Sequence, residues 1–266
     1  MEPLVLIHGF SGIPAMWDPM VPALQERFGV HALGLAGHFG CAELPEGTVV
    51  SAEALFDALE RDLDAAGFDT AHVCGNSLGG WAALELAKRG RARSCVALAP
   101  AGGWEPGSKE ENRLKWLFRR LHWTSLRANP YREKLFLRPG LRRLAMLDVV
   151  EHGERLTPRQ AADILQGSAE CPIYRDLFEA VRRDGPPKDF DAISCPTTIV
   201  WGTKDRIIPM KSYSERIRRM VPQAEWVVLE GAGHSPMVDE SERLVGIIEE
   251  TASRARERVA AAYPAA

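Results

Sequence analysis

Short apolar runs alternate with amphipathic segments along this chain, and this alternation constrains the fold more than any other feature. We predict buried strands at residues 4–7, 30–35, 70–74, 94–99, 197–201 and 225–229. Apolar residues recur at helical spacing in 14–27, 78–89, a stretch near 211–220 and roughly 238–260, so we predict helices there. A further helix is predicted in the segment that Ser51 can cap. Strand, helix and strand in succession form βαβ units, so the pattern predicts an α/β fold with a mostly parallel central sheet flanked by helices.

The alternation stops near Gly103 and resumes near residue 191. Residues 104–190 contain several helix-like stretches and no convincing strand. The charge also changes here: residues 1–100 hold 6 Lys and Arg against 12 Asp and Glu, whereas residues 109–143 hold 11 against 3. We therefore expect a core formed by residues 1–103 and 191–266, interrupted by a helical insert at residues 104–190.

Composition excludes several classes of protein. The 266 residues are 45% hydrophobic and 26% charged, which excludes a disordered chain, a collagen-like fibre and a small disulfide scaffold. A net charge of −3 does not favour nucleic acid as a partner. The five cysteines are an odd number without a C-x-x-C pair, which indicates reduced thiols rather than disulfides or a zinc site.

The N-terminus does not resemble a signal peptide. Glu2 and Pro3 precede only four apolar residues before His8 and Gly9 end the run. No apolar stretch reaches the length of about 20 residues that a membrane-spanning helix needs. We expect a soluble, cytoplasmic protein without stable insertion into a membrane.

The segment Gly75-Asn76-Ser77-Leu78-Gly79 matches the G-x-S-x-G pattern. A predicted strand precedes it and a predicted helix follows it, which is the context that a nucleophile elbow requires. The turn must lift Ser77 off the end of the sheet in a strained backbone conformation, and the glycines avoid clashes between strand and helix. An ordinary glycine-rich turn with a surface serine is the alternative, and the flanking strand and helix favour the elbow.

A serine hydroxyl becomes a good nucleophile only beside a base that a carboxylate orients. Asp205 follows the strand predicted at 197–201, and His234 follows the strand predicted at 225–229. The order serine, acid, histidine is the one found with this elbow. Each residue alone could be a solvated loop residue, but three in this order, each just beyond a strand, predict a catalytic triad.

The first predicted strand is followed by His8-Gly9-Phe10. In the predicted fold the Phe10 N–H lies beside the Leu78 N–H, and the pair would bind an oxyanion. We expect a structural role for His8. His38, in a glycine-rich loop, is a rival base that we rank lower because it precedes the serine and has no carboxylate nearby in sequence.

These motifs resemble the α/β-hydrolase superfamily over nearly the whole chain. The resemblance rests on the segments at 8–10, 75–80, 201–205 and 231–234. It implies Ser77 as nucleophile, His234 as general base and acid, and Asp205 as orienting acid. It also implies the Phe10 and Leu78 amides as the oxyanion hole, and the helical insert as a cap over the pocket.

Departures from relatives narrow the expected activity. Haloalkane dehalogenases and epoxide hydrolases of this superfamily carry Asp at the elbow, where this chain has Ser77. Plant-type hydroxynitrile lyases have Lys after the catalytic histidine, and carbon–carbon hydrolases of ring-cleavage products, which share the Gly-Asn-Ser elbow, typically have Trp there. This chain has Ser235, which is similar to simple esterases.

The insert carries an apolar stripe of Leu114, Leu117, Phe118 and Leu121, surrounded by Arg119, Arg120, Arg127 and Arg132. Three interpretations stay open: a lid over an apolar substrate, a basic amphipathic element that touches lipid weakly, and a helix packed on the core with a solvated face. Under the first interpretation Trp104, Trp116 and Trp123 contact the substrate.

We therefore expect a serine carboxylester hydrolase that acts on small to medium apolar esters through an acyl-enzyme, without metal or organic cofactor. A carbon–carbon bond hydrolase of ring-cleavage diketo acids and a lactonase or acyltransferase are enzyme alternatives that could use the same triad. A hydrolase-like protein that only binds its ligand is the alternative from another class.

Overall fold

The computed structural model describes residues 1–262 and contains one six-stranded sheet in which every neighbouring pair of strands is parallel. The strand order is β2-β1-β3-β4-β5-β6. The strands are β1 (Glu2–Ile7), β2 (Phe28–Leu33), β3 (Ala71–Asn76), β4 (Ala92–Leu98), β5 (Thr197–Gly202) and β6 (Glu225–Leu229). All six predicted strands are present, which confirms the predicted α/β class.

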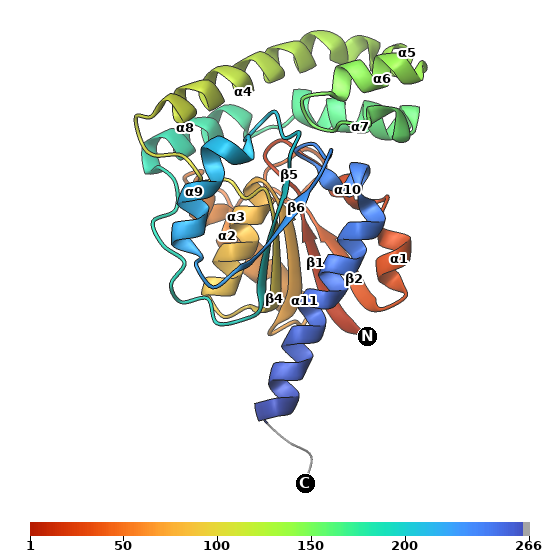
Figure 1. Cartoon of the computed structure of the whole chain (residues 1–266). Coiled ribbons are helices and arrows are strands. Elements are labelled where there is room, and N and C mark those ends of the chain that lie inside the picture. The colour runs from red at the N-terminus through yellow and green to blue at the C-terminus, as the bar shows by residue number, and fades with distance from the viewer. Residues whose placement is uncertain (263–266) are drawn as a thin grey trace.

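Helices cover both faces of the sheet (Figure 1). One face packs against α2 (Ala52–Ala65), α3 (Leu78–Lys88) and α9 (Met210–Met220). The other face packs against α1 (Val21–Gln25) and α11 (Ser241–Ala262). The helix predicted at 14–27 is instead divided into a 3-10 turn η1 (Pro14–Trp17) and α1, because Pro19 and Pro22 lack the N–H that a continuous helix needs. The helix predicted at 238–260 is likewise divided, into α10 (Pro236–Asp239) and α11.

The helical insert lies over the carboxyl ends of the strands (Figure 1). Every one of its residues is described, and none lies in a strand. It contains α4 (Lys109–Ala128), η2 (Asn129–Tyr131), α5 (Arg132–Leu135), α6 (Pro139–Met146), η3 (Gly153–Arg155), α7 (Pro158–Ala169) and α8 (Tyr174–Asp184). Among the helices of residues 1–262, none combines the length and the apolar character needed to cross a bilayer.

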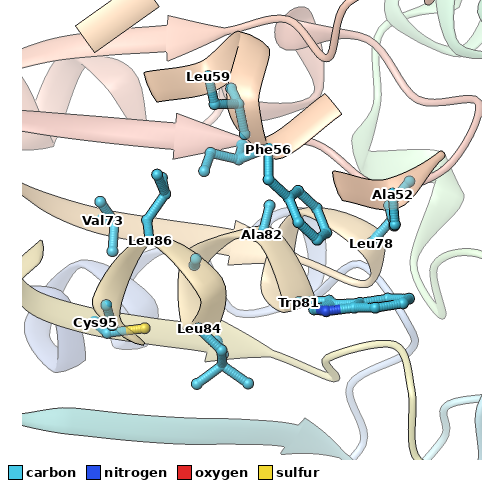
Figure 2. Packing of buried hydrophobic residues seen from close by; sticks show 14 of the residues in the cluster. Ala52, Phe56, Leu59, Val73, Leu78, Trp81, Ala82, Leu84, Leu86 and Cys95 are labelled. Atoms are coloured by element: carbon cyan, nitrogen blue, oxygen red, sulfur yellow. The ribbon is translucent and has the colours of Figure 1, made fainter. Parts of the chain in front are cut away.

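The packing of α3 against α2 and the sheet fixes the start of α3 (Figure 2). Phe56 on α2 meets Trp81 on α3 edge-to-face, with ring centroids 5.6 Å apart. Both rings are at least 93% buried, and such aromatic pairs add about 1 kcal/mol beyond their buried area. The N-terminal turn of α3, which begins directly after Ser77, is therefore held rigidly on the sheet.

Two buried histidines hold the loops after β1 and β2 together. The His8 imidazole accepts a hydrogen bond from the Leu35 N–H at 3.0 Å, and its ring packs on His38 with centroids 5.1 Å apart. Burial lowers the pKa of His8 to about 3 and that of His38 to about 4. Both rings are therefore neutral in the folded protein at any pH above 5.

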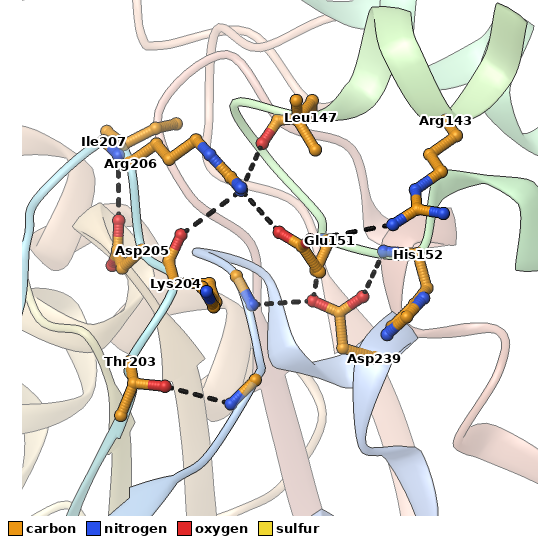
Figure 3. Close-up of polar contacts among 12 residues, drawn as sticks. Arg143, Leu147, Glu151, His152, Thr203, Lys204, Asp205, Arg206, Ile207 and Asp239 are labelled. Carbon is orange, nitrogen blue, oxygen red and sulfur yellow. Dashed lines mark hydrogen bonds and ion pairs between the residues drawn. The ribbon is translucent and has the colours of Figure 1, made fainter. Parts of the chain in front are cut away.

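A second connection joins the insert to the loop after β6 (Figure 3). The buried carboxylate of Asp239 accepts hydrogen bonds from the backbone N–H groups of Glu151 at 3.0 Å, His152 at 2.8 Å and Gly233 at 2.8 Å. Two of these donors belong to the insert and the third belongs to the loop that carries His234. One side chain therefore fixes the position of the insert relative to that loop.

We expect acid to destabilise the protein through the buried histidines. Because the folded pKa of His38 lies below its ordinary value of 6.5, the unfolded chain binds a proton that the folded chain rejects, so stability falls below pH 6.5. Between pH 7 and pH 5 this loss is about 2 kcal/mol. Urea unfolding at the two pH values measures it. In His38→Phe the difference between the two pH values should shrink by about that amount, and an unchanged difference contradicts the assignment.

The Asp239 connection also predicts a stability effect. Asp239→Ala leaves one buried and two partly buried N–H groups without an acceptor and should lower the free energy of unfolding by about 3 kcal/mol. Asp239→Asn keeps an acceptor oxygen and should lose less than half of that. Thermal and urea unfolding give both values, with Glu46→Ala, an exposed acid in a loop, as the matched control. Equal stability of Asp239→Ala and the control would show that the connection is unimportant.

Candidate active site

Ser77 sits in a strained turn between β3 and α3. Its backbone has φ 58° and ψ −115°, a left-handed conformation that a residue with a side chain rarely adopts. Three backbone hydrogen bonds hold it: the Ser77 N–H donates to the Leu98 carbonyl, and the Ser77 carbonyl accepts from Trp81 and Ala101, all at 2.9–3.0 Å. The strain predicted for this elbow is therefore present, and the surrounding structure maintains it.

The elbow also depends on glycine at two positions. A Cβ at Gly75 would lie 1.9 Å from the Gly79 carbonyl oxygen, and one at Gly79 would lie 2.2 Å from the Ile7 carbonyl oxygen. Either contact would push α3 away from the sheet. The first turn of α3 therefore directs its free N–H groups past Ser77, where a negative charge would be stabilised.

His234 and Asp205 are brought together from the loops after β6 and β5. The His234 Nδ1 and the Asp205 Oδ2 lie 2.8 Å apart, and both side chains are at least 95% buried. The other Asp205 oxygen accepts from the backbone N–H groups of Ile207 at 2.9 Å and Ile208 at 2.8 Å. Asp205 is thus oriented on both sides, and its carboxylate favours the His234 tautomer with the proton on Nδ1.

Ser77 and His234 line one cavity, together with Phe10 and residues of the insert. Within residues 1–262, no direct hydrogen bond joins the Ser77 hydroxyl to the His234 ring. Such contacts are often long before substrate binds and shorten in the complex. The Nε2 side of His234 is the one left to accept a proton from a hydroxyl in this cavity.

Asn76 is a residue of the site that the sequence reasoning did not single out. Its amide nitrogen donates to the His234 carbonyl at 2.9 Å and to the Leu98 carbonyl at 3.3 Å, and its amide oxygen accepts from the Ser235 hydroxyl at 3.3 Å. The elbow is thereby connected to the backbone of His234 and to the side chain of Ser235. Asp239 was missed for a similar reason, because its partners are distant in sequence. Its position five residues after His234 was the only local signal for it.

Phe10 and Leu78 come from neighbouring strands. β1 pairs with β3, with Ile7 beside Gly75, so the residues that follow both strands emerge at the same edge. Both residues line a narrow cavity that also contains Ser77. The structure therefore brings both residues, which were predicted to form the oxyanion hole, to the same cavity as Ser77. The hydrogen bond that His8 accepts from Leu35 fits the structural role expected for His8.

Two cavities meet at Ser77. The larger has a volume of about 340 Å³ and contains His234, Arg120 and Tyr174. The smaller, about 70 Å³, is mainly apolar, and Glu111, Lys115 and Arg182 are its charged residues. Its apolar walls come from Trp81, Trp104, Leu114, Phe118, Leu177, Phe178, Val181 and Ile208. The core and the insert therefore both contribute walls, and Phe118, like Phe10 and Ser77, lines both cavities.

Not every residue expected at the site is found there. Trp104 lines the smaller cavity, but Trp116 and Trp123 line neither, and they are 64% and 55% exposed. The expected contact of these two tryptophans with substrate in the pocket is therefore not supported, because they lie on the outer face of α4. His38, the rival base, lines a different cavity from Ser77.

Comparisons with known proteins agree with this fold. A model of the alpha/beta hydrolase family matches residues 4–247. Epoxide hydrolase EphH from Mycobacterium tuberculosis is 32% identical over 200 residues, which cover 75% of this chain and 94% of that protein. Lipase 1 from Psychrobacter immobilis is 27% identical over 248 residues, covering 90% of this chain and 73% of the lipase. A thermophilic esterase from Thermogutta terrifontis superposes with a TM-score of 0.69 at 25% identity, covering 96% of this chain and 90% of that one.

The matched region contains all of the six-stranded sheet except the first two residues of β1, and it includes the loops that carry Ser77, Asp205 and His234. The match and the parallel sheet lead to one conclusion. The chain belongs to the alpha/beta hydrolase family.

Proposed function

We propose that this protein is a serine carboxylesterase with Ser77, His234 and Asp205 as its catalytic triad. The observation that carries the proposal is the pairing of His234 with Asp205, whose other carboxylate oxygen accepts two backbone hydrogen bonds. His234 lines the same cavity as the strained Ser77. A strained serine at a helix N-terminus and an imidazole oriented by a buried carboxylate are the parts that acyl transfer requires. The similarity to a lipase and to an esterase supports ester substrates.

The mechanism has two halves. His234 removes the hydroxyl proton of Ser77 as Ser77 attacks the ester carbonyl carbon, and the Phe10 and Leu78 amides bind the developing oxyanion. His234 then returns the proton to the departing alcohol, which leaves an acyl group on Ser77. Water gives a proton to His234 and attacks this acyl-enzyme, and His234 then returns the proton to the Ser77 oxygen as the acid departs. Asp205 keeps the imidazole in the required tautomer in both halves.

The insert acts as a cap in this proposal. Leu114 and Phe118 of α4 and Leu177 of α8 supply apolar walls opposite Ser77. These side chains favour an apolar acyl or alkyl group of small to medium size and exclude water from the smaller cavity. The larger cavity contains more polar groups and is suited to the other part of the ester and to the water of the second half.

Epoxide hydrolysis is the second candidate, because the relative EphH is named an epoxide hydrolase. Hydrolases of this superfamily that open epoxides resemble this chain but carry Asp at the elbow, where this chain has Ser77. A serine attack on an epoxide would leave an ether, which the triad cannot hydrolyse. Ester cleavage is therefore the better match to the residues present.

Hydrolysis of p-nitrophenyl esters of increasing chain length tests the proposal. Wild-type protein should release p-nitrophenolate with an initial burst of about one equivalent, since the acyl group accumulates on Ser77. Ser77→Ala should lose at least about 10³-fold in kcat/KM, while Ser212→Ala on the exposed side of α9 should match wild type. Styrene oxide and a ring-cleavage diketo acid are assayed in parallel. Turnover of either one without ester hydrolysis would reject the esterase assignment.

Asp205→Asn tests the role of the carboxylate separately from folding. The asparagine oxygen would retain the Ile207 and Ile208 N–H groups, so its NH₂ group would face His234 and donate to Nδ1. The imidazole proton would then move to Nε2, which could no longer accept the proton of Ser77. We expect kcat to fall by about 10⁴-fold at neutral pH with little change in melting temperature. A loss below 10-fold would show that Asp205 does not orient the base.

A further inference from the structure

The outer face of the insert gathers exposed apolar side chains. Nine large apolar side chains in residues 1–262 are at least half exposed, and six of them lie between residues 116 and 144. They are Trp116, Trp123, Leu126, Tyr131, Leu137 and Leu144, with exposed fractions of 50–70%. Monomeric soluble proteins rarely concentrate apolar side chains in this way without a partner. We call these six residues the outer apolar face.

Basic residues accompany the apolar ones on the same face of α4. Trp116, Arg119, Trp123 and Arg127 follow one another at intervals of three or four residues, so they form one stripe along the helix. The Arg127 guanidinium stacks on the Trp123 ring at 4.1 Å, and the Arg120 guanidinium lies 5.5 Å from the Trp116 ring. Leu117 on the opposite side of the helix is buried. The stripe therefore faces away from the core.

The charge of this region is not neutralised within the molecule. Residues 109–143 hold 11 Lys and Arg against 3 Asp and Glu. Arg119, Arg127, Lys134 and Arg138 are exposed, and none forms an ion pair within the described residues. An anionic partner is thus the one that matches the charge.

The larger cavity is lined in part by the same segments that carry the outer apolar face. Leu144 is 70% exposed and also lines the cavity that contains Ser77 and His234. Ala128 and Leu135, which lie between members of the outer apolar face in sequence, line this cavity as well. A partner bound to the outer apolar face would therefore contact segments that also form walls of the candidate active site.

We propose that the outer apolar face docks on an anionic lipid surface. The apolar side chains are spread along α4 and the segments that follow it, and Figure 1 shows α4 at the end of the molecule opposite the last turns of α11. Tryptophan and tyrosine with adjacent arginines are the combination that lies at a membrane–water interface, with the rings among the headgroups and the cations on phosphates. This arrangement favours lipid over an acidic protein, because a folded protein would need a surface whose shape matches the outer apolar face, whereas lipids rearrange around it. Docking does not depend on the proposed ester hydrolysis.

Sedimentation with sucrose-loaded vesicles tests the proposal. Vesicles with 30% phosphatidylglycerol in phosphatidylcholine should carry wild-type protein into the pellet, whereas pure phosphatidylcholine should carry much less. The reversal Arg119→Glu, Arg127→Glu and Arg138→Glu should weaken binding at least about 100-fold, since each basic residue near an anionic surface contributes about 1 kcal/mol. Trp116→Ser with Trp123→Ser should weaken it at both low and high salt.

Matched controls place the same changes elsewhere on the surface. Arg61→Glu, Lys211→Glu and Arg243→Glu reverse three exposed cations outside the insert, and Val49→Ser with Val259→Ser removes exposed apolar groups outside it. Both controls should bind as wild type does, and circular dichroism verifies that every variant is folded.

Four results would overturn the proposal: no binding to anionic vesicles, equal binding to neutral ones, equal loss in controls and variants, or a dimer that Trp116→Ser with Trp123→Ser dissociates. Binding to poly-L-glutamate without vesicle binding would instead assign the face to an acidic protein.

Discussion

Hydrogen bonds between six strands that all run in one direction bring every loop that follows a strand to the same edge of the sheet. Phe10, Ser77, Asp205 and His234 each follow a different strand, so their proximity depends on this single constraint. Parallel neighbours also require long connections, which the helices on both faces supply. The candidate site is therefore a consequence of the direction of the strands before it is a consequence of any contact between its own residues.

The site also depends on buried polar groups whose partners are nearly all backbone atoms. Asp205 accepts from two N–H groups besides contacting His234, and Asn76 connects the elbow to the carbonyl of His234. Such bonds fix side-chain orientation at little entropic cost because the backbone is already ordered. The left-handed conformation of Ser77 costs about 1–3 kcal/mol, and the backbone hydrogen bonds that Ser77 forms with Leu98, Trp81 and Ala101 maintain it.

The insert is attached to the loops of the site rather than only resting on them. Arg206, which follows Asp205, contacts the Glu151 carboxylate at 2.7 Å, and Asp239 contacts the backbone at Glu151 and His152 (Figure 3). A movement of the insert would therefore be transmitted to the loops after β5 and β6. This attachment gives a physical route by which a surface bound to the outer apolar face could affect the candidate active site.

Apolar periodicity and glycine-rich turns are local properties of the chain, and they were enough to predict the α/β class, the six strands and the order of the three triad candidates. It also indicated the helical insert, through the loss of strand pattern and the change of charge. Which tryptophans face a cavity became clear only in the folded chain: Trp104 lines one, whereas Trp116 and Trp123 are exposed. Helical spacing does not reveal which face of α4 the core covers when both faces carry large apolar residues. The contacts of Asn76 and Asp239 were likewise found only in the folded chain, because their hydrogen-bond partners lie between 6 and 159 residues away in sequence.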